Sequence, residues 1–228
     1  MPAILTDQLT KRFGSFTAVD NVRLNINDGE IYALVGPNGA GKTTLVKMMV
    51  GILSPTRGTV KIAGFDICRS PLTARKNFGY VPDDPSGYDY LSGMEFLIFT
   101  GRLRGIEKGK LERRIKELVR LFPITDVIYR PMGDYSRGNK QKLAVLAAII
   151  SEPQVLFIDE PVVGLDPPSI RILGRILTEY AGNGKTVFFV THILDFARDF
   201  AHRTGVMKEG KIVEEIQLTK KVDLNELL

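Results

Sequence analysis

The sequence of 228 residues contains a single cysteine, Cys68, and only two histidines. One cysteine excludes an intramolecular disulfide and a cysteine-rich metal site, and we expect Cys68 to be a buried small hydrophobic residue. The longest apolar run, from Leu143 to Ile150, is far shorter than the roughly 20 residues of a membrane-spanning helix. The first ten residues show no basic segment followed by an apolar one, so we expect no secretory signal and a location inside the cell.

The remaining composition is that of a globular protein, with 44% hydrophobic and 25% charged residues. A net charge of +5 permits contact with nucleic acid or anionic lipid but requires neither. Many of the basic residues lie between Arg102 and Arg120, in a segment with helical spacing. Two interpretations remain open there: a helix face in water, or a face that meets a membrane surface or a partner.

The segment from residue 31 to residue 52 predicts a strand, a glycine-rich loop and a helix. The apolar run Ile31 to Val35 is typical of a strand buried on both faces, and apolar residues recur at helical spacing after Thr44. Between them, residues 36–43 read Gly-Pro-Asn-Gly-Ala-Gly-Lys-Thr and fit the phosphate-binding loop. Backbone N–H groups and the helix N-terminus would surround a polyphosphate, Lys42 would reach its β and γ phosphates, and Thr43 would ligate Mg²⁺. The alternative is a glycine-rich connection without function.

Two carboxylates, Asp159 and Glu160, end a second apolar run that begins at Val155. The carboxyl ends of parallel strands meet at one edge of a sheet, so these side chains would lie beside the phosphate loop. Neighbouring residues of an extended chain point apart, which allows Asp159 to face Mg²⁺ and Glu160 to face the γ-phosphate. The alternative is a pair of acidic residues in an ordinary strand-to-helix turn.

The order of predicted elements places two distant segments in one sheet. Residues 59–67 resemble a small hairpin, residues 94–121 are helical, and Ser136 is expected to cap a further helix. Residues 155–158 and 186–190 then predict buried strands separated by a helix near residues 169–181.

These motifs together resemble the nucleotide-binding subunits of ABC transporters over nearly the whole chain. Further segments follow the order of that family: Tyr135-Ser136-Arg137-Gly138-Asn139 is similar to its signature loop, Gly164-Leu165-Asp166-Pro167 to its D-loop, and Thr191-His192 to its switch histidine. Alone, a histidine such as His192 is more often structural, but it follows a predicted strand. His202 has no such context and is expected to be structural.

The resemblance implies an α/β fold: a P-loop NTPase (RecA-like) core with a mostly parallel sheet, an N-terminal antiparallel β subdomain and an inserted α-helical subdomain. The whole of residues 1–228 would form one ATPase domain. Residues 1–84 and 151–228 would form the ATP-binding core with the antiparallel subdomain, and residues 85–150 the helical subdomain.

The resemblance also implies ATP and Mg²⁺ as cofactors. Glu160 and His192 would be catalytic, and the metal ligands would be Thr43, Asp83 and Asp159. The ATP-binding residues would be Phe13, Gly36, Pro37, Asn38, Gly39, Ala40, Gly41, Lys42, Thr43, Thr44, Ser136, Gly138 and Asp166.

Partners follow from the same resemblance. Two subunits, identical or different, would close head to tail on two ATP molecules, bound to the cytoplasmic face of the cell membrane through a separate permease. No nucleic acid is expected. Residues 85–99 would dock the permease, with Tyr88 and Tyr90 as candidates for a groove, although a helical core explains Phe96 and Phe99 equally well.

The chain departs from the family at the signature, where Arg137 and Asn139 replace glycine and glutamine, and at Asp83, where glutamine is usual. We expect Asp83 still to act at the metal and to respond to the γ-phosphate. The signature and Asp83 together weakly resemble subunits of exporter-type permeases. Two other readings are soluble ABC-type ATPases that act on DNA or ribosomes, and a nucleotide-binding scaffold without hydrolysis. The cargo cannot be read from this chain.

Overall fold

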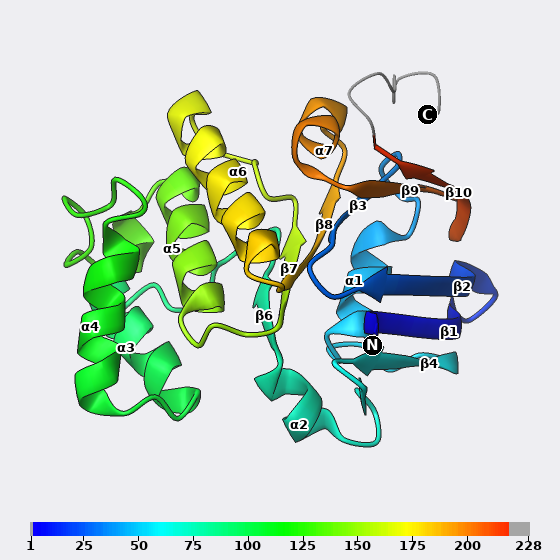
Figure 1. Cartoon of the computed structure of the whole chain (residues 1–228), viewed down its shortest axis with the longest axis horizontal. Coiled ribbons are helices and arrows are strands. Elements are labelled where there is room, and N and C mark those ends of the chain that lie inside the picture. The colour runs from blue at the N-terminus through cyan, green and yellow to red at the C-terminus, as the bar shows by residue number, and fades with distance from the viewer. Residues whose placement is uncertain (1, 219–228) are drawn as a thin grey trace.

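The computed structural model describes residues 2–218 and centres on a six-stranded sheet with the strand order β10-β9-β3-β8-β7-β6 (Figure 1). Four of its five strand pairings are parallel, and the pairing of β9 with β10 is antiparallel. The strands are β3 (Ile31–Val35), β6 (Phe78–Val81), β7 (Val155–Asp159), β8 (Thr186–Thr191), β9 (Arg203–Lys208) and β10 (Lys211–Gln217). Met1 and residues 219–228, which the sequence predicts to belong to the ATP-binding core, lie outside the described residues.

Both faces of this sheet are buried, which explains the continuous apolar runs of its strands. In β7, Leu156 and Ile158 face one apolar core, while Val155 and Phe157 face the other. All five residues of β7 are buried. Parallel strands are covered on both faces in α/β proteins. The alternate residues of a strand, which point to opposite faces, must therefore all be apolar. The prediction of one sheet from two distant segments is confirmed.

A second sheet of four antiparallel strands, in the order β2-β1-β4-β5, covers one face together with α1 (Figure 1). Its elements are β1 (Pro2–Phe13), β2 (Phe16–Asn27), β4 (Arg57–Ile62) and β5 (Phe65–Asp66), and α1 spans Lys42–Met49. The hairpin expected over residues 59–67 is present as β4 and β5. The full length of β1 and the β9–β10 hairpin were not predicted.

Helices cover the other face and form a layer at the far side of the molecule from β1 and β2 (Figure 1). They are α3 (Gly93–Leu103), α4 (Lys108–Val119), the short η1 (Met132–Asp134), α5 (Arg137–Ile149), α6 (Pro167–Gly182) and α7 (Leu194–Phe200), while α2 (Pro71–Lys76) precedes β6. Helix α5 packs against β6, and α3 packs against both α4 and α5. The predicted helical segment is therefore a separate layer joined to the edge of the sheet. No helix among residues 2–218 is long and apolar enough to span a bilayer.

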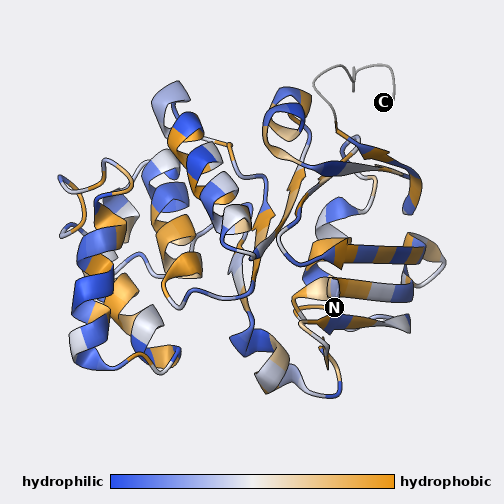
Figure 2. Ribbon diagram, viewed as in Figure 1, coloured by the Kyte–Doolittle hydropathy of each residue, from blue (hydrophilic) through white to orange (hydrophobic). Residues whose placement is uncertain are grey.

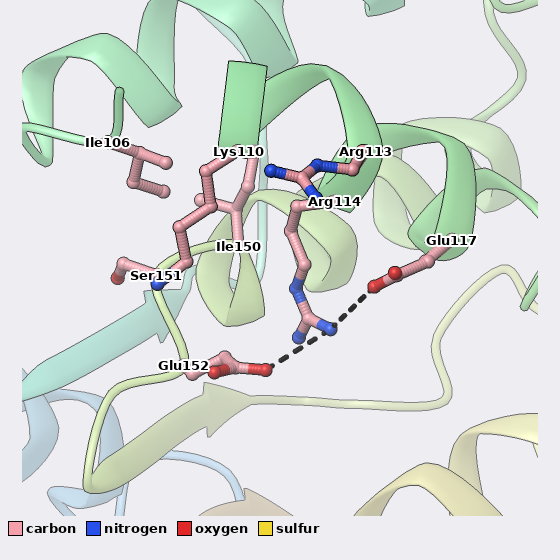
Figure 3. Close-up of a pocket in the computed structure, with 8 residues that line it drawn as sticks. All are labelled: Ile106, Lys110, Arg113, Arg114, Glu117, Ile150, Ser151 and Glu152. Carbon is pink, nitrogen blue, oxygen red and sulfur yellow. Dashed lines mark hydrogen bonds and ion pairs between the residues drawn. The ribbon is translucent and has the colours of Figure 1, made fainter. Parts of the chain in front are cut away.

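The basic helix α4 shows a mostly hydrophilic outer surface (Figure 2), and one of its arginines is a packing residue. Arg114 Nη1 pairs with Glu152 at 3.2 Å and with Glu117 at 3.5 Å, and its Nη2 donates to the carbonyl of Ile149 at 3.4 Å. Arg114, Glu117 and Glu152 are among the residues that line a hollow of about 380 Å³ (Figure 3). The bond to Glu152 joins α4 to the turn between α5 and β7. Arg114 thus ties α4 to the end of α5 and the turn that follows it, while Arg113 stays exposed.

Two expectations for single residues have opposite outcomes. His202 is structural, because its Nδ1 accepts a hydrogen bond from the backbone N–H of Ile31 at 3.2 Å. The expectation that Cys68 is buried is wrong, because it is exposed in the turn after β5. The neighbouring Ile67 takes the buried position, and the Cys68 N–H donates to the Asp66 carboxylate at 2.9 Å.

Candidate functional site

The glycine-rich loop connects the end of β3 at Val35 to the start of α1 at Lys42, as the sequence predicts. Gly41 has φ of 103°, and a side chain there would collide with the carbonyl oxygen of Ala18. A side chain at Gly36 would collide with the carbonyl oxygen of Met207. The loop is therefore pressed between β2 and β9, where only glycine fits. Its outer residues, Pro37, Asn38 and Gly39, are exposed, as is Thr43, whereas Ala40 is buried and Thr44 is half-buried.

Lys42 is folded inward over this loop. Its Nζ donates to the carbonyls of Gly36 at 2.7 Å and of Pro37 at 3.0 Å. Burial lowers the pKa of the Lys42 ammonium, and the negative charges of Glu160 and Asp159 oppose that shift. The ammonium thus lies in the electrostatic field of both carboxylates, and its carbonyl partners can be exchanged for phosphate oxygens.

Asp159 stands at the end of β7 and is 1% exposed. Its Oδ1 lies 3.5 Å from the Thr43 hydroxyl, and its Oδ2 is buried without a hydrogen-bond partner. The pKa of Asp159 is raised to about 6, mainly by burial. The hydrogen bond with Thr43 lowers this pKa, whereas the negative charges of Asp83 and Glu160 raise it further. A buried carboxylate oxygen without a partner, beside a hydroxyl, is a donor set suited to Mg²⁺, which prefers one or two protein oxygens plus phosphates and water. The residues fit the metal.

Glu160 has a left-handed backbone, with φ of 54°. Its N–H donates to the Val190 carbonyl at 2.9 Å, which ties the residue to the end of β8. Its Oε2 accepts a bond from the Thr191 hydroxyl at 3.3 Å and faces His192 Nδ1 at 3.0 Å. A carboxylate only accepts, so Nδ1 carries the proton in this pair. Such non-glycine conformations persist where the surroundings fix them, and they gather at functional sites.

The four polar residues of the predicted catalytic group are therefore at one edge of the sheet: Lys42, Asp159, Glu160 and His192. The arrangement provides an ammonium, a metal-binding carboxylate and a second carboxylate held by a histidine. It suits transfer of a phosphoryl group to water.

Comparison with known proteins agrees with this geometry. The sequence profile described as "ABC transporter" matches residues 19–163. The chain belongs to the ABC transporter family.

Its relatives in that family include the bacitracin transport ATP-binding protein BcrA of Enterococcus faecalis, which is 38% identical over 95% of this chain and 70% of BcrA. The daunorubicin/doxorubicin resistance ATP-binding protein DrrA of Streptomyces peucetius is 35% identical over 93% of this chain and 64% of DrrA. The chain thus spans about two thirds of the length of these relatives.

Solved structures show the same fold. One described as the ATP-binding subunit of an ABC transporter has a TM-score of 0.92 and 29% identity, covering 99% of this chain and 97% of its own. The CbiO1 subunit of Clostridium perfringens has a TM-score of 0.83 and 25% identity, covering 99% of this chain and 92% of its own. This ABC subunit therefore has the expected P-loop NTPase fold, and it binds and hydrolyses ATP for a transporter. Subunits of this kind form pairs and work with membrane permeases.

Residues 135–139, which the sequence predicts to be the signature loop, lie against the loop that follows Glu160. Ser136 is the N-cap of α5, and its side chain accepts a bond from the Asn139 N–H at 3.3 Å. A side chain on Gly138 would collide with the carbonyl oxygen of Gly164. Asp166 caps α6 by accepting from the Ser169 N–H at 2.9 Å. The Ser169 side chain, and after it this backbone hydrogen bond, lower the pKa of the Asp166 carboxyl.

Asp83 follows β6, and it is paired with a residue that the sequence alone did not connect to it. Its Oδ1 lies 3.1 Å from Nη2 of Arg137, in the signature loop. The two departures from the family pattern are therefore in contact.

Two further positions complete the comparison with the sequence. Phe13 lies near the tip of the β1–β2 hairpin and is 49% exposed as a residue. Lys11 Nζ lies 5.1 Å from the centroid of its ring. Gln141 was not singled out from the sequence. It is buried on α5, and its Nε2 lies 3.4 Å from the carbonyl oxygen of Pro161 and 3.5 Å from that of Glu160. Its position three residues after Gly138 on the signature helix is the signal that could have identified it.

Proposed function

We propose that the site works as a magnesium-dependent ATPase centre that is complete only when two subunits pair head to tail. The unpartnered Oδ2 of Asp159 and the Thr43 hydroxyl support a metal position, and the exposed loop residues 37–39 support a phosphate position above it. Asp83 would act at the same metal. Bound Mg²⁺ would neutralise charge on the phosphates and hold them in line with the attacking water.

Glu160 would orient and polarise that water. Its Oε2 is occupied by Thr191 and His192, whereas its Oε1 has no hydrogen-bond partner among residues 2–218. The free oxygen is therefore available to a water molecule. When both of its ring nitrogens carry a proton, His192 would donate from Nδ1 to Glu160 and from Nε2 to the γ-phosphate. Lys42 would exchange its loop carbonyls for phosphate oxygens.

The remaining ATP contacts would come from both subunits. The exposed ring of Phe13 would stack on adenine. Ser136, Gly138 and the N-terminus of α5 would contact the γ-phosphate held by the other subunit. Asp166 would lie at the same junction between subunits while it caps α6.

The permease would dock beside α3. A hollow of about 230 Å³ there is lined by residues that include Tyr80, Pro85, Tyr88 and Phe96. The ring centroids of Tyr88 and Phe96 lie 5.2 Å apart, so Phe96 contributes to an aromatic cluster at the surface. Tyr90 is 99% exposed. A groove of this kind suits a short helix from a partner.

The proposal includes the division into an ATP-binding core (residues 1–84 and 151–228) and a helical subdomain (residues 85–150), with docking at the cytoplasmic face of the membrane. Relatives named for bacitracin transport and for daunorubicin/doxorubicin resistance support an export-type permease. The same names give no support to a soluble ATPase acting on nucleic acid or ribosomes.

The bond between Glu160 and His192 is the observation that carries this function, and Glu160→Gln tests it. The amide cannot polarise water as the carboxylate does, so hydrolysis should fall by at least about 100-fold, the lower range for general-base removal. ATP should then stay bound, and sedimentation velocity with MgATP should show a stable dimer.

The matched control is Glu179→Gln, which neutralises an exposed carboxylate on α6 and should leave turnover and assembly unchanged. Turnover at the wild-type rate by the Glu160→Gln protein, or a monomer at every MgATP concentration, would contradict the proposal.

A further inference from the structure

Two ion pairs join the first turns of α5 to the segment that follows β6. Arg137 Nη2 lies 3.1 Å from Asp83 Oδ1, and Lys140 Nζ lies 3.1 Å from Asp89 Oδ1. The backbone adds a third link, because the Gly133 N–H donates to the Asp89 carbonyl at 2.9 Å. The segment after β6 is therefore held at Asp83 and Asp89 against α5, and at Asp89 also against η1.

Arg137 occupies a position that disfavours a positive charge. It is the first residue of α5, close to the positive end of the helix, and the first turn contains no acidic residue. A carboxylate from elsewhere in the chain must compensate, and Asp83 is that carboxylate. The pair is thus a specific arrangement of two charges that are each unfavourable alone.

Asp83 is unfavourable alone because it stands beside the candidate metal and phosphate site. After burial, its negative charge is among the influences that raise the pKa of Asp159. The pKa of Tyr80 is also raised, to about 12. Burial is the main cause, and the charges of Asp159 and Asp83 add to it. An unpaired carboxylate at this place would also repel the phosphates of ATP.

Arg137 also lies close to a second loop. A side chain added to Gly164 would lie 3.2 Å from Cγ of Arg137, so the arginine stem lies against the loop that follows Glu160. Arg137 is therefore placed between the loop that carries Asp83 and the loop that leads from Glu160 to α6.

We propose that Arg137 is a positioning residue for Asp83. Its guanidinium neutralises the carboxylate, fixes it beside the phosphates and ties the loop after β6 to the signature helix of the same subunit. The inference rests on the proposed function, because it takes Asp83 to face MgATP.

A double-mutant cycle tests the pair by equilibrium binding, independently of turnover and of dimer formation. The variants are Arg137→Gln, Asp83→Asn and both together, and the readout is the Kd of an ATP analogue with a fluorescent methylanthraniloyl group, titrated with Mg²⁺ present. Arg137→Gln should weaken binding by about two- to fivefold, the range that exposed ion pairs give in such cycles. In the Asp83→Asn background the same change should alter Kd by less than about 1.5-fold, because no carboxylate is left to neutralise.

Two further variants separate positioning from general effects of charge. Arg137→Lys keeps the positive charge and should recover most of the lost affinity. Lys140→Gln removes a positive charge one turn further along α5, from the pair with Asp89, and should change Kd by less than about 1.5-fold. Both side chains of the Arg137–Asp83 pair are about half exposed, so all variants should keep the wild-type unfolding midpoint.

The inference is overturned if Arg137→Gln has no effect, has the same effect with and without Asp83, or is not relieved by Arg137→Lys. In those cases nucleotide binding by the wild type would still stand, and only the role of Arg137 would fall. Failure of the wild type to bind the analogue would overturn the proposed function together with this inference.

Discussion

Replacing Asp159 with asparagine should make the nucleotide-free protein more stable while it abolishes magnesium-dependent nucleotide binding. Asp159 is 1% exposed, its Oδ2 has no partner, and its pKa is raised from 3.8 to about 6, mainly by burial. The folded protein therefore holds an ionised carboxylate at neutral pH in surroundings that disfavour it. The side chain is kept at a cost in stability that metal binding would offset.

The magnitude follows from the difference between the folded and unfolded pKa. About two pKa units correspond to about 3 kcal/mol, at about 1.4 kcal/mol per unit. Because the folded pKa is the higher one, the favourable contribution of protonated Asp159 is fully present below about pH 3.8. It is lost as the pH rises towards 6, so the wild type is penalised by about 3 kcal/mol at pH 8 and about half of that at pH 5.

Urea unfolding at pH 5 and pH 8, with EDTA and without nucleotide, measures this difference. Asp159→Asn should exceed the wild type in unfolding free energy by about 3 kcal/mol at pH 8 and by about half of that at pH 5. Added MgATP should stabilise only the wild type. The control is Asp195→Asn on α7, whose carboxylate is 75% exposed and should give a difference within about 0.5 kcal/mol. An Asp159→Asn protein no more stable than the wild type at pH 8 would refute the reasoning.

Two further substitutions test the scaffold around the site. Gly41→Ala should cost more than about 2 kcal/mol and abolish ATP binding, because the new methyl group meets the Ala18 carbonyl and φ is 103°. The control is Gly184→Ala, because Gly184 has φ of 74° but open space around it. This change should lower the free energy of unfolding by only about 1 kcal/mol in thermal unfolding. Equal losses of stability at the two glycines would contradict the packing argument. Arg114→Ala should cost about 1–2 kcal/mol in urea unfolding, after allowance for its 24% exposure, whereas Arg113→Ala should stay within about 0.5 kcal/mol. Equal stability of these two variants would show that the bonds of Arg114 in Figure 3 do not hold α4.

The sequence by itself determined the elements whose signals are local. The run Ile31 to Val35, the glycines that follow and the helical spacing after Thr44 lie within about twenty residues, so their strand, loop and helix could be predicted. The end of β7 at Asp159 could be predicted for the same reason. The edge strand β10 was missed because alternation on a largely exposed strand is a weaker signal than a doubly buried run. The buried strand β9 was missed because Thr204 and Gly205 interrupt its apolar run.

Only the tertiary structure decided which side chains meet. Asp83 and Arg137 are 54 residues apart, and the sequence marks each as unusual without pairing them. The contact of Glu160 with His192 depends on β7 and β8 being neighbours in register, which places Asp159 opposite Val190. Cys68 was misjudged because residue type gives only an average preference for burial, whereas the turn after β5 turned Ile67 inward and Cys68 outward. Local spacing fixes an element, but contacts between loops depend on how the sheet brings the ends of distant strands to one edge.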